Sequence, residues 1–371
     1  MPVPLLDLVA QYQTIRDEIE PAMQAVILRQ GFIMGPEVAA LEQAIAQTVG
    51  VPHAVACASG TDALLLPLRA LGLAPGDEVI TPSFTFFATA GTIHNAGGTP
   101  VFADIDPDTF NISPEALEAR LTSRTRAIVV VHLFGQMARM DRIMAIAARH
   151  GLPVIEDGAQ SIGARQQVGG AWRTPGQLGM VASLSFFPSK NLGAFGDGGM
   201  MLTTDPVLAE RLARLRLHGG AKQYHHDEVG FNSRLDTLQA AVLLVKLRHL
   251  AAWTKARQER AERYHHAFSG LDGVVPPVVD EGNEHVWHQY TIRAARRDEL
   301  MAHLKERGIG CAVYYPRALH LQPCFAHLGT APGSLPNTEA AMASVLSLPI
   351  YPELSEQQQD EVVGAIKGFY T

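Results

Sequence analysis

The chain has 371 residues, 47% of them hydrophobic and 18% charged, which is typical of a globular protein large enough for two domains. A formal net charge of -7 and scattered basic residues argue against nucleic acid as a partner. No apolar run reaches the roughly 18 residues of a membrane span, and the first residues lack a signal peptide's charged and apolar regions. We therefore expect a cytoplasmic protein with no membrane partner.

The cysteines and histidines do not predict a metal site. Cys57, Cys311 and Cys324 are too widely spaced for a disulfide framework or a zinc site, and we expect them to be reduced. The histidine pairs at 225–226 and 265–266 lack the HxxxH spacing of metal-binding helices. No metal is expected.

Apolar residues recur at helical spacing over 14–29 and 36–48, which predicts two helices. Short apolar strands then alternate with helical segments as far as about residue 215. The predicted strands span 53–57, 77–82, 100–105, 127–135, 153–157, 183–187 and 198–204. This alternation predicts an α/β fold with a mostly parallel seven-stranded sheet between layers of helices. No GxGxxG motif follows a strand and no GxxxxGK[ST] motif occurs, which excludes the Rossmann and P-loop classes.

The last third of the chain has a different pattern. Residues 235–250 predict an apolar helix, and a second long helix is predicted to reach about residue 268. Beyond Gly270 the element lengths change and prolines cluster at positions 276, 277 and 316. We expect a large domain over 1–250 and a smaller α/β domain over 251–371.

The segment 183–200 places Lys190 between a β-prone aromatic run and a loop with four glycines. Pro188 ends the strand, and the glycines let the backbone approach a bulky group. Partial burial would lower the pKa of such a lysine and free its amine to attack carbonyl carbons. The alternative is a solvated loop lysine.

Two upstream motifs offer partners for this amine. Asp157 ends a predicted strand, and open α/β sheets bind ligands at the carboxyl ends of their strands. Alternatively, Asp157 caps a helix that starts near Gly158. Small residues at 59–62 precede a helical pattern, and the free N–H groups of a helix start favour a phosphate. A phosphate site, a buried carboxylate and an amine are what pyridoxal phosphate requires.

Five motifs follow one another in the order SGTDAL, TPSFTFFAT, VIEDGAQSIGA, SFFPSKNLGAFGDGG and GFNSRLDTLQAA. This order resembles the DegT/StrS-type nucleotide-sugar aminotransferases, and the likeness runs nearly from end to end. The resemblance implies a fold-type I, pyridoxal phosphate-dependent enzyme. It also implies pyridoxal 5'-phosphate bound covalently to Lys190, pyridoxamine phosphate as an intermediate form, and a homodimer with shared active sites.

The resemblance assigns catalytic roles to Lys190 and to Asp157, which pairs with the ring nitrogen. The other residues that it places at the cofactor are Gly60, Thr61, Phe86, Gln160, Ser185 and Asn232. Phe86 would stack on the ring, and Asn232 would reach the phosphate of the neighbouring subunit. The residues that it places at the sugar are Arg234, Tyr314, Tyr315 and His320, beside a sugar-facing loop at 215–230. Taken alone, Phe86 is a core residue and Arg234 forms a helix-entry salt bridge. Tyr314 stands where similar enzymes usually have histidine.

The implied reaction moves an amino group from L-glutamate, which leaves as 2-oxoglutarate, to a keto sugar on a nucleotide, in amino-sugar synthesis for surface polysaccharides or glycosides. The motifs are most similar to the branch that aminates C3, and we favour a UDP-2-acetamido-3-oxo-hexuronate whose carboxylate faces Arg234. A dTDP-3-oxo-6-deoxyhexose and a C4-keto sugar remain alternatives. Other functions on this fold are a dehydratase with histidine in place of Lys190, a cysteine desulfurase or threonine-type lyase, and a non-catalytic regulatory or ligand-binding protein.

Overall fold

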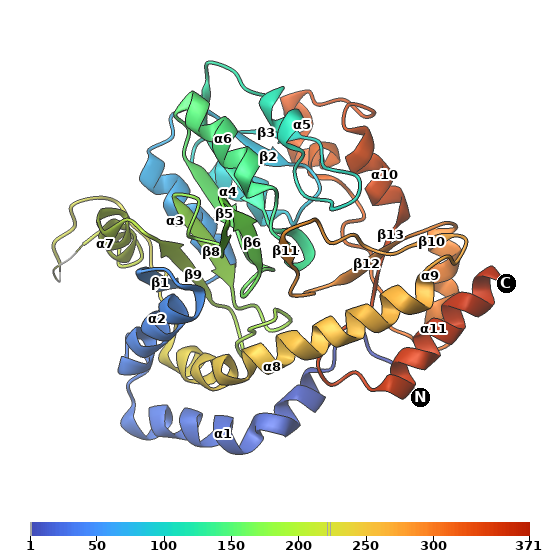
Figure 1. Ribbon diagram of the computed structural model, residues 1–371. Coiled ribbons are helices and arrows are strands. Elements are labelled where there is room, and N and C mark those ends of the chain that lie inside the picture. Colours follow the sequence, from blue (N-terminus) through green and yellow to red (C-terminus); the bar gives the residue numbers. More distant parts are fainter. Residues whose placement is uncertain (1, 221, 223) are drawn as a thin grey trace.

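A seven-stranded sheet forms the centre of the computed structural model, which describes residues 2–220, 222 and 224–371 (Figure 1). All seven predicted strands are present. Their order is β1 (His53–Cys57), β9 (Gly199–Thr203), β8 (Val181–Ser185), β5 (Val154–Asp157), β4 (Thr125–Val131), β2 (Glu78–Pro82) and β3 (Thr99–Ala103). Neighbouring strands are parallel except where β9 pairs with β1 and β8. The prediction of a mostly parallel sheet is therefore confirmed.

Helices cover both faces of this sheet (Figure 1). They are α2 (Pro36–Val49), α3 (Gly60–Leu71), α4 (Ala88–Asn95), α5 (Pro114–Glu118), α6 (Met140–His150), α7 (Pro206–Leu215) and α8 (Thr237–Phe268), whereas α1 (Leu8–Arg29) packs against α8. Successive side chains of β8 point to opposite faces, because the side-chain period of a strand is two. Val181 packs in the apolar cluster of α3, α4 and α7, whereas Ala182 and Leu184 pack in the cluster of α2 and α8. Both faces are buried, which explains why the strands are apolar throughout.

The two helices expected at 14–29 and 36–48 are confirmed as α1 and α2. The helix α1 starts earlier, at Leu8, because the Asp7 side chain accepts a hydrogen bond from Ala10 N at 2.8 Å. The prediction of two helices over residues 235–268 is wrong. They form the single helix α8 of 32 residues, since no glycine or proline interrupts that segment.

The C-terminal part has its own core. A three-stranded sheet contains β10 (Val274–Val275), β12 (Tyr290–Ala294) and β13 (Val345–Leu348), and the helices are α9 (Arg297–Glu306), α10 (Pro336–Ser344) and α11 (Glu356–Tyr370). The end of α8 packs there through Tyr264 and Phe268, as does Val3 from the other end of the chain. Position 250 lies within α8, and the division into 1–250 and 251–371 stays a prediction. None of the helices in the described ranges is both long and apolar enough to cross a bilayer.

Short elements complete the fold. They are a sheet of β11 (Asn283–Glu284), β6 (Arg165–Val168) and β7 (Ala171–Arg173), and the 3₁₀ helices η1 (Leu133–Gly135), η2 (Leu319–Leu321) and η3 (Pro323–Leu328).

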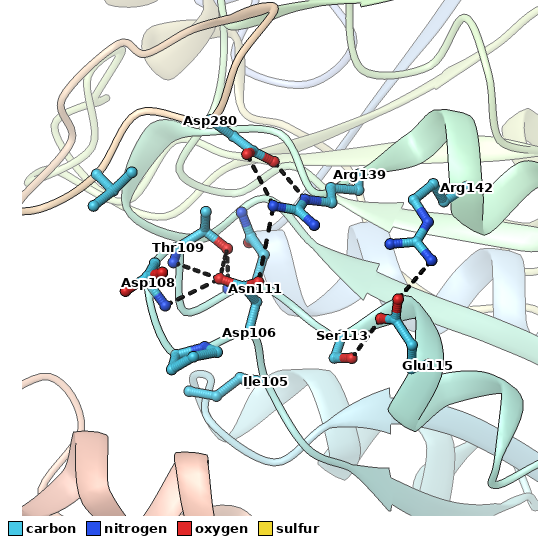
Figure 2. A network of polar contacts seen from close by, with 12 residues as sticks. Ile105, Asp106, Asp108, Thr109, Asn111, Ser113, Glu115, Arg139, Arg142 and Asp280 are labelled. Carbon is cyan, nitrogen blue, oxygen red and sulfur yellow. Dashed lines mark hydrogen bonds and ion pairs between the residues drawn. The ribbon is translucent and has the colours of Figure 1, made fainter.

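A polar network joins three segments beyond the ends of β3 and β4 (Figure 2). Arg139 donates two hydrogen bonds to Asp280, from Nε at 2.7 Å and from Nη2 at 3.0 Å. The Asp106 carboxylate lies 3.9 Å from Arg139 and accepts hydrogen bonds from the N–H groups of Asp108 and Thr109. The network thereby ties the loops around residues 106 and 139 to the segment that leads into β11.

Candidate active site

Two strand ends bring the predicted catalytic residues together. Asp157 is the last residue of β5, and β5 runs parallel to β8, which ends at Ser185. Lys190 follows in a turn closed by the hydrogen bond from its N–H to Phe187 O at 2.8 Å. Gly193 is required here, because a Cβ atom on it would lie 2.2 Å from the Pro188 carbonyl oxygen.

Asp157 is buried and held by two donors. Thr89 Oγ1 donates to its Oδ2 at 2.8 Å, and Ala159 N donates to its Oδ1 at 3.2 Å. Burial raises the pKa of Asp157, while these two hydrogen bonds and the charge of Lys190 act in the opposite direction. The alternative that Asp157 caps a helix is wrong, because none of the described residues between β5 and β6 is helical.

Lys190 is half-buried, and the burial of its amino end lowers its pKa to about 8, although the Asp157 charge acts to raise it. A large share of the amine is therefore neutral in mildly alkaline solution. This is the form that attacks carbonyl carbons. The geometry favours the nucleophile over a freely solvated loop lysine.

The start of α3 faces Ser185 and forms a cradle for an anion. Ser59 caps the helix, with its Oγ accepting from Asp62 N at 3.1 Å and its carbonyl oxygen accepting from Ala63 N at 3.0 Å. The N–H groups of Gly60 and Thr61 have no acceptor among the described residues. A Cβ atom on Gly60 would lie 2.5 Å from Ser185 Cβ, so only glycine lets the helix start come this close. Free N–H groups beside a hydroxyl suit a phosphate.

Aromatic and amide groups lie on another side of the site. Gln160 accepts from Phe134 N at 2.6 Å and donates to the Tyr315 hydroxyl at 3.1 Å. The Phe86 ring is 59% exposed, with its centroid 6.5 Å from that of Tyr315. The alternative that Phe86 is a core residue is therefore wrong, and an exposed ring here can stack on a flat ligand.

Comparison with known proteins agrees with this geometry. The sequence matches the DegT/DnrJ/EryC1/StrS aminotransferase family over residues 13–367. The chain belongs to this family. The family predicted from the five motifs is therefore confirmed, as is the fold, since solved members of the family superpose closely on the chain.

Three relatives of the DegT/DnrJ/EryC1/StrS family carry different names. A "Pleiotropic regulatory protein" of Geobacillus stearothermophilus is 52% identical over 100% of this chain and 99% of its own. A UDP-N-acetyl-3-dehydro-alpha-D-glucosamine 3-aminotransferase of Acidithiobacillus ferrooxidans is 46% identical over 98% of this chain and 97% of its own. A UDP-2-acetamido-2-deoxy-3-oxo-D-glucuronate aminotransferase of Pseudomonas aeruginosa is 44% identical over 95% of this chain and 96% of its own.

Two solved structures are also similar. Streptomyces venezuelae DesV, in complex with a ketimine intermediate, has a TM-score of 0.96 at 44% identity over 100% of this chain and 98% of its own. Bacillus subtilis NtdA, with bound cofactor PMP, has a TM-score of 0.91 at 33% identity over 98% and 84%.

Four of the residues suggested by the family resemblance make no hydrogen bond or ion pair with the Lys190 side chain among the described residues. Asn232 is exposed, and Arg234 lines a surface cavity of about 1000 Å³ with part of the loop at 215–230, of which residues 221 and 223 lie outside the described residues. His320 is buried, with its ring nitrogens 2.7 Å from Ser83 Oγ and 3.3 Å from Glu339 Oε1. Tyr314 lines a small cavity together with Ser189, the residue before Lys190. Their roles at the cofactor or the sugar stay predictions.

Within the described parts of the chain, the side chains of Asn232 and Arg234 make no hydrogen bond or ion pair with Lys190 or Asp157. Arg234 also forms no salt bridge there, although a helix-entry salt bridge was the alternative role for it.

Two polar residues at the site were missed by sequence reasoning. Thr89 holds Asp157, and His288 Nδ1 lies 3.1 Å from the side-chain oxygen of Asn191, the residue after Lys190. Thr89 could have been found, because it follows Phe86 by about one helical turn. His288 had no such signal, since it lies far along the chain in a segment without a motif.

Proposed function

We propose that this protein is a pyridoxal phosphate-dependent aminotransferase that moves an amino group from L-glutamate to the C3 keto group of a nucleotide-linked sugar. The observation that carries this proposal is an amine of lowered pKa, Lys190, which interacts with the charge of the buried Asp157 and follows Ser185, the residue that faces the start of α3. Family membership and the PMP-bound structure of a relative support it.

The residues fit this cofactor. The N–H groups of Gly60 and Thr61 and the Ser185 hydroxyl would hold the phosphate, in a space that a Cβ atom on Gly60 would fill. Asp157 would keep the ring nitrogen protonated, and Thr89 holds its carboxylate in place. When bound, pyridoxal phosphate supplies an electron-accepting ring and an aldehyde carbon.

Lys190 has two roles in this proposal. Its amine provides the covalent attachment point for the cofactor. Once released, Nζ takes the proton from the α carbon of glutamate as a general base, which its lowered pKa permits. A second copy of the chain would supply Asn232, so we propose a homodimer, located in the cytoplasm.

For the sugar, we propose a UDP-2-acetamido-3-oxo-hexuronate. Two relatives are named for UDP sugars with a keto group at C3, and one of these sugars is a hexuronate. Arg234, half-buried and without an ion-pair partner in the described chain, would face the sugar carboxylate. A dTDP sugar is the second choice, because another relative is a dTDP-3-amino-3,4,6-trideoxy-alpha-D-glucose transaminase.

A second candidate function is regulation without catalysis, because the relative at 52% identity is named as a regulatory protein. An absorbance spectrum separates the two. We expect a visible cofactor band in the wild type that excess L-glutamate removes, and no such band in Lys190→Ala. A panel of UDP and dTDP keto sugars would then identify which one restores the band. A wild type with no band after addition of pyridoxal phosphate would favour regulation.

A further inference from the structure

A cavity of about 80 Å³ lies next to Lys190 and has no role in the proposal above. Its polar lining includes Ser189, the residue before Lys190, and Arg257 from α8, together with His288, Gln289 and Tyr314. The rest of the wall is mainly leucine and isoleucine. Since a carboxylate needs only a few tens of Å³ and a nucleotide-linked sugar far more, the space suits a small polar group.

Arg257 is a buried cation whose charge is not paired. It is 3% exposed, and its Nη1 donates to Trp287 O at 3.1 Å and to Ile350 O at 2.7 Å. Nε and Nη2 have no acceptor within the described ranges. The charge of Glu353 favours the guanidinium, but no ion pair joins the two there. Burial lowers the pKa of Arg257 to about 10, so the group still carries its charge at neutral pH.

Unpaired buried cations are uncommon, because removing a charge from water is costly unless an anion replaces the lost hydration. The free Nε and Nη2 groups of an arginine are two parallel donors that match the two oxygens of a carboxylate. Gln289 Oε1 is also buried without a partner and can accept a hydrogen bond from an amino group. An amino acid carries both complementary groups.

His288 connects this cavity to the Lys190 turn. Its Nδ1 lies 3.1 Å from Asn191 Oδ1, and Asn191 Nδ2 donates to Val286 O at 3.0 Å, which makes Oδ1 the acceptor and Nδ1 the donor. Burial first, and then the charges of Lys190 and Arg257, hold the pKa of His288 well below its ordinary value. A neutral His288 therefore lies within the influence of both cations, and the cavity is close to the reacting amine.

We propose that this cavity receives a carboxylate of the amino acid that donates the amino group, with Arg257 as its cationic anchor. The inference rests on the proposed function and adds a binding site for the donor. The sugar would occupy other space, because it cannot enter the cavity. Arg257 thereby orients the donor so that its amino group points toward Lys190.

Calorimetric titration of the cofactor-loaded protein with glutarate tests this proposal. Glutarate has two carboxylates and no amine, so binding is measured without turnover. We expect Arg257→Gln to weaken glutarate binding by about tenfold or more, as for loss of a charge-assisted hydrogen-bond pair. Arg260→Gln is the matched control. Arg260 lies on the same helix and donates to Leu354 O at 2.7 Å, but does not line the cavity. The glutarate affinity of Arg260→Gln should stay within about twofold of the wild-type affinity.

Because Arg257→Gln removes two buried hydrogen bonds, a second variant preserves them. Gln289→Glu is nearly isosteric and places a negative charge on the cavity wall. It should weaken glutarate binding and raise KM for L-glutamate by about tenfold, with KM for the keto sugar unchanged. Circular dichroism would confirm that each variant is folded.

Two results would overturn the inference: no binding of glutarate by the wild type, or equal affinity in the wild type and in folded Arg257→Gln and Gln289→Glu. Neither depends on the proposed function. That proposal fails separately, if L-glutamate does not remove the cofactor band of the wild type.

Discussion

Lys190 and Asp157 control each other's charge. Burial acts against the ionised form of both groups, lowering the pKa of Lys190 and raising that of Asp157. Each group's charge opposes the shift of the other. A change in one residue should therefore be measurable as a change in the titration of the other, and this coupling separates a shared site from two independent buried groups.

The rate at which cofactor-free protein takes up pyridoxal phosphate should follow this titration. Only the neutral amine attacks the aldehyde, so the rate should rise with pH to a midpoint near 8, against 10.5 for an ordinary lysine. Asp157→Asn removes the charge that favours the ammonium, and its midpoint should lie lower. The measurement is the growth of the visible band from about pH 6 to about pH 10, with Lys190→Ala as the blank. A rate that is still rising at pH 10 with no midpoint near 8, or an upward shift of the midpoint in Asp157→Asn, would contradict it.

For individual residues, the sequence allowed prediction of the site residues that lie at or just beyond the ends of strands. Asp157 and Lys190 could be predicted because a buried strand and a glycine-rich turn mark their positions locally. Thr89 and His288 act through contacts across 68 and 97 residues of chain, to Asp157 and Asn191 respectively. Such contacts depend on how the elements pack, which no local pattern encodes.

At the scale of the elements, the close approach of α3 to Ser185 requires a glycine at position 60. A Cβ atom in Gly60→Ala would meet Ser185 Cβ at 2.5 Å, and the helix start and the Ser185 hydroxyl would have to move apart. We expect the dissociation constant of pyridoxal phosphate to rise by about tenfold, since each hydrogen bond to a charged group contributes about 1.5–3 kcal/mol. An absorbance titration would measure it. Gly364→Ala in α11, where a Cβ atom meets nothing within 4 Å, is the control, and equal affinity in the two variants would exclude the steric argument.

The polar network of Figure 2 allows a comparison of two arginines. Arg139 makes a two-fold hydrogen bond to Asp280, across 141 residues of chain, whereas Arg142 pairs with Glu115 where both side chains are well exposed. Arg139→Ala should lower the free energy of unfolding by about 1 kcal/mol, and Arg142→Ala by less than about 0.5 kcal/mol. Urea unfolding would measure both. Equal losses would mean that the two-fold geometry adds nothing to stability.

The directions and ends of the secondary-structure elements were harder to predict from local sequence patterns than the existence of the elements. The seven strands were predictable because both faces of the sheet are buried and their apolar runs are continuous. The antiparallel direction of β9 was not predictable, since direction depends on the path of the connection. The length of α8 was missed because the change from apolar to charged residues near position 250 resembles a helix end. It marks instead where the helix passes from one core cluster to the next.

In the whole molecule, one chain accounts for only part of the proposed site. Lys190, Asp157 and the cradle of α3 belong to the same chain, whereas no contact in its described part links the Asn232 side chain to them. Asn232 is also exposed, as a residue that reaches into a neighbouring subunit would be in an isolated chain. We therefore propose that the site is complete only in a dimer. This arrangement predicts that two different inactive subunits can repair each other.

Mixing Lys190→Ala with Asn232→Ala tests that arrangement. If Asn232 serves the partner's site, a hybrid dimer has one site with Lys190 from one subunit and Asn232 from the other, both intact. After unfolding and refolding together, about half of the dimers are hybrids with one of two sites restored, so about a quarter of wild-type turnover should return. Lys190→Ala mixed with Asp157→Asn is the control, because both residues belong to one chain and no hybrid site is complete. Recovery in neither mixture would show that Asn232 does not act across the interface.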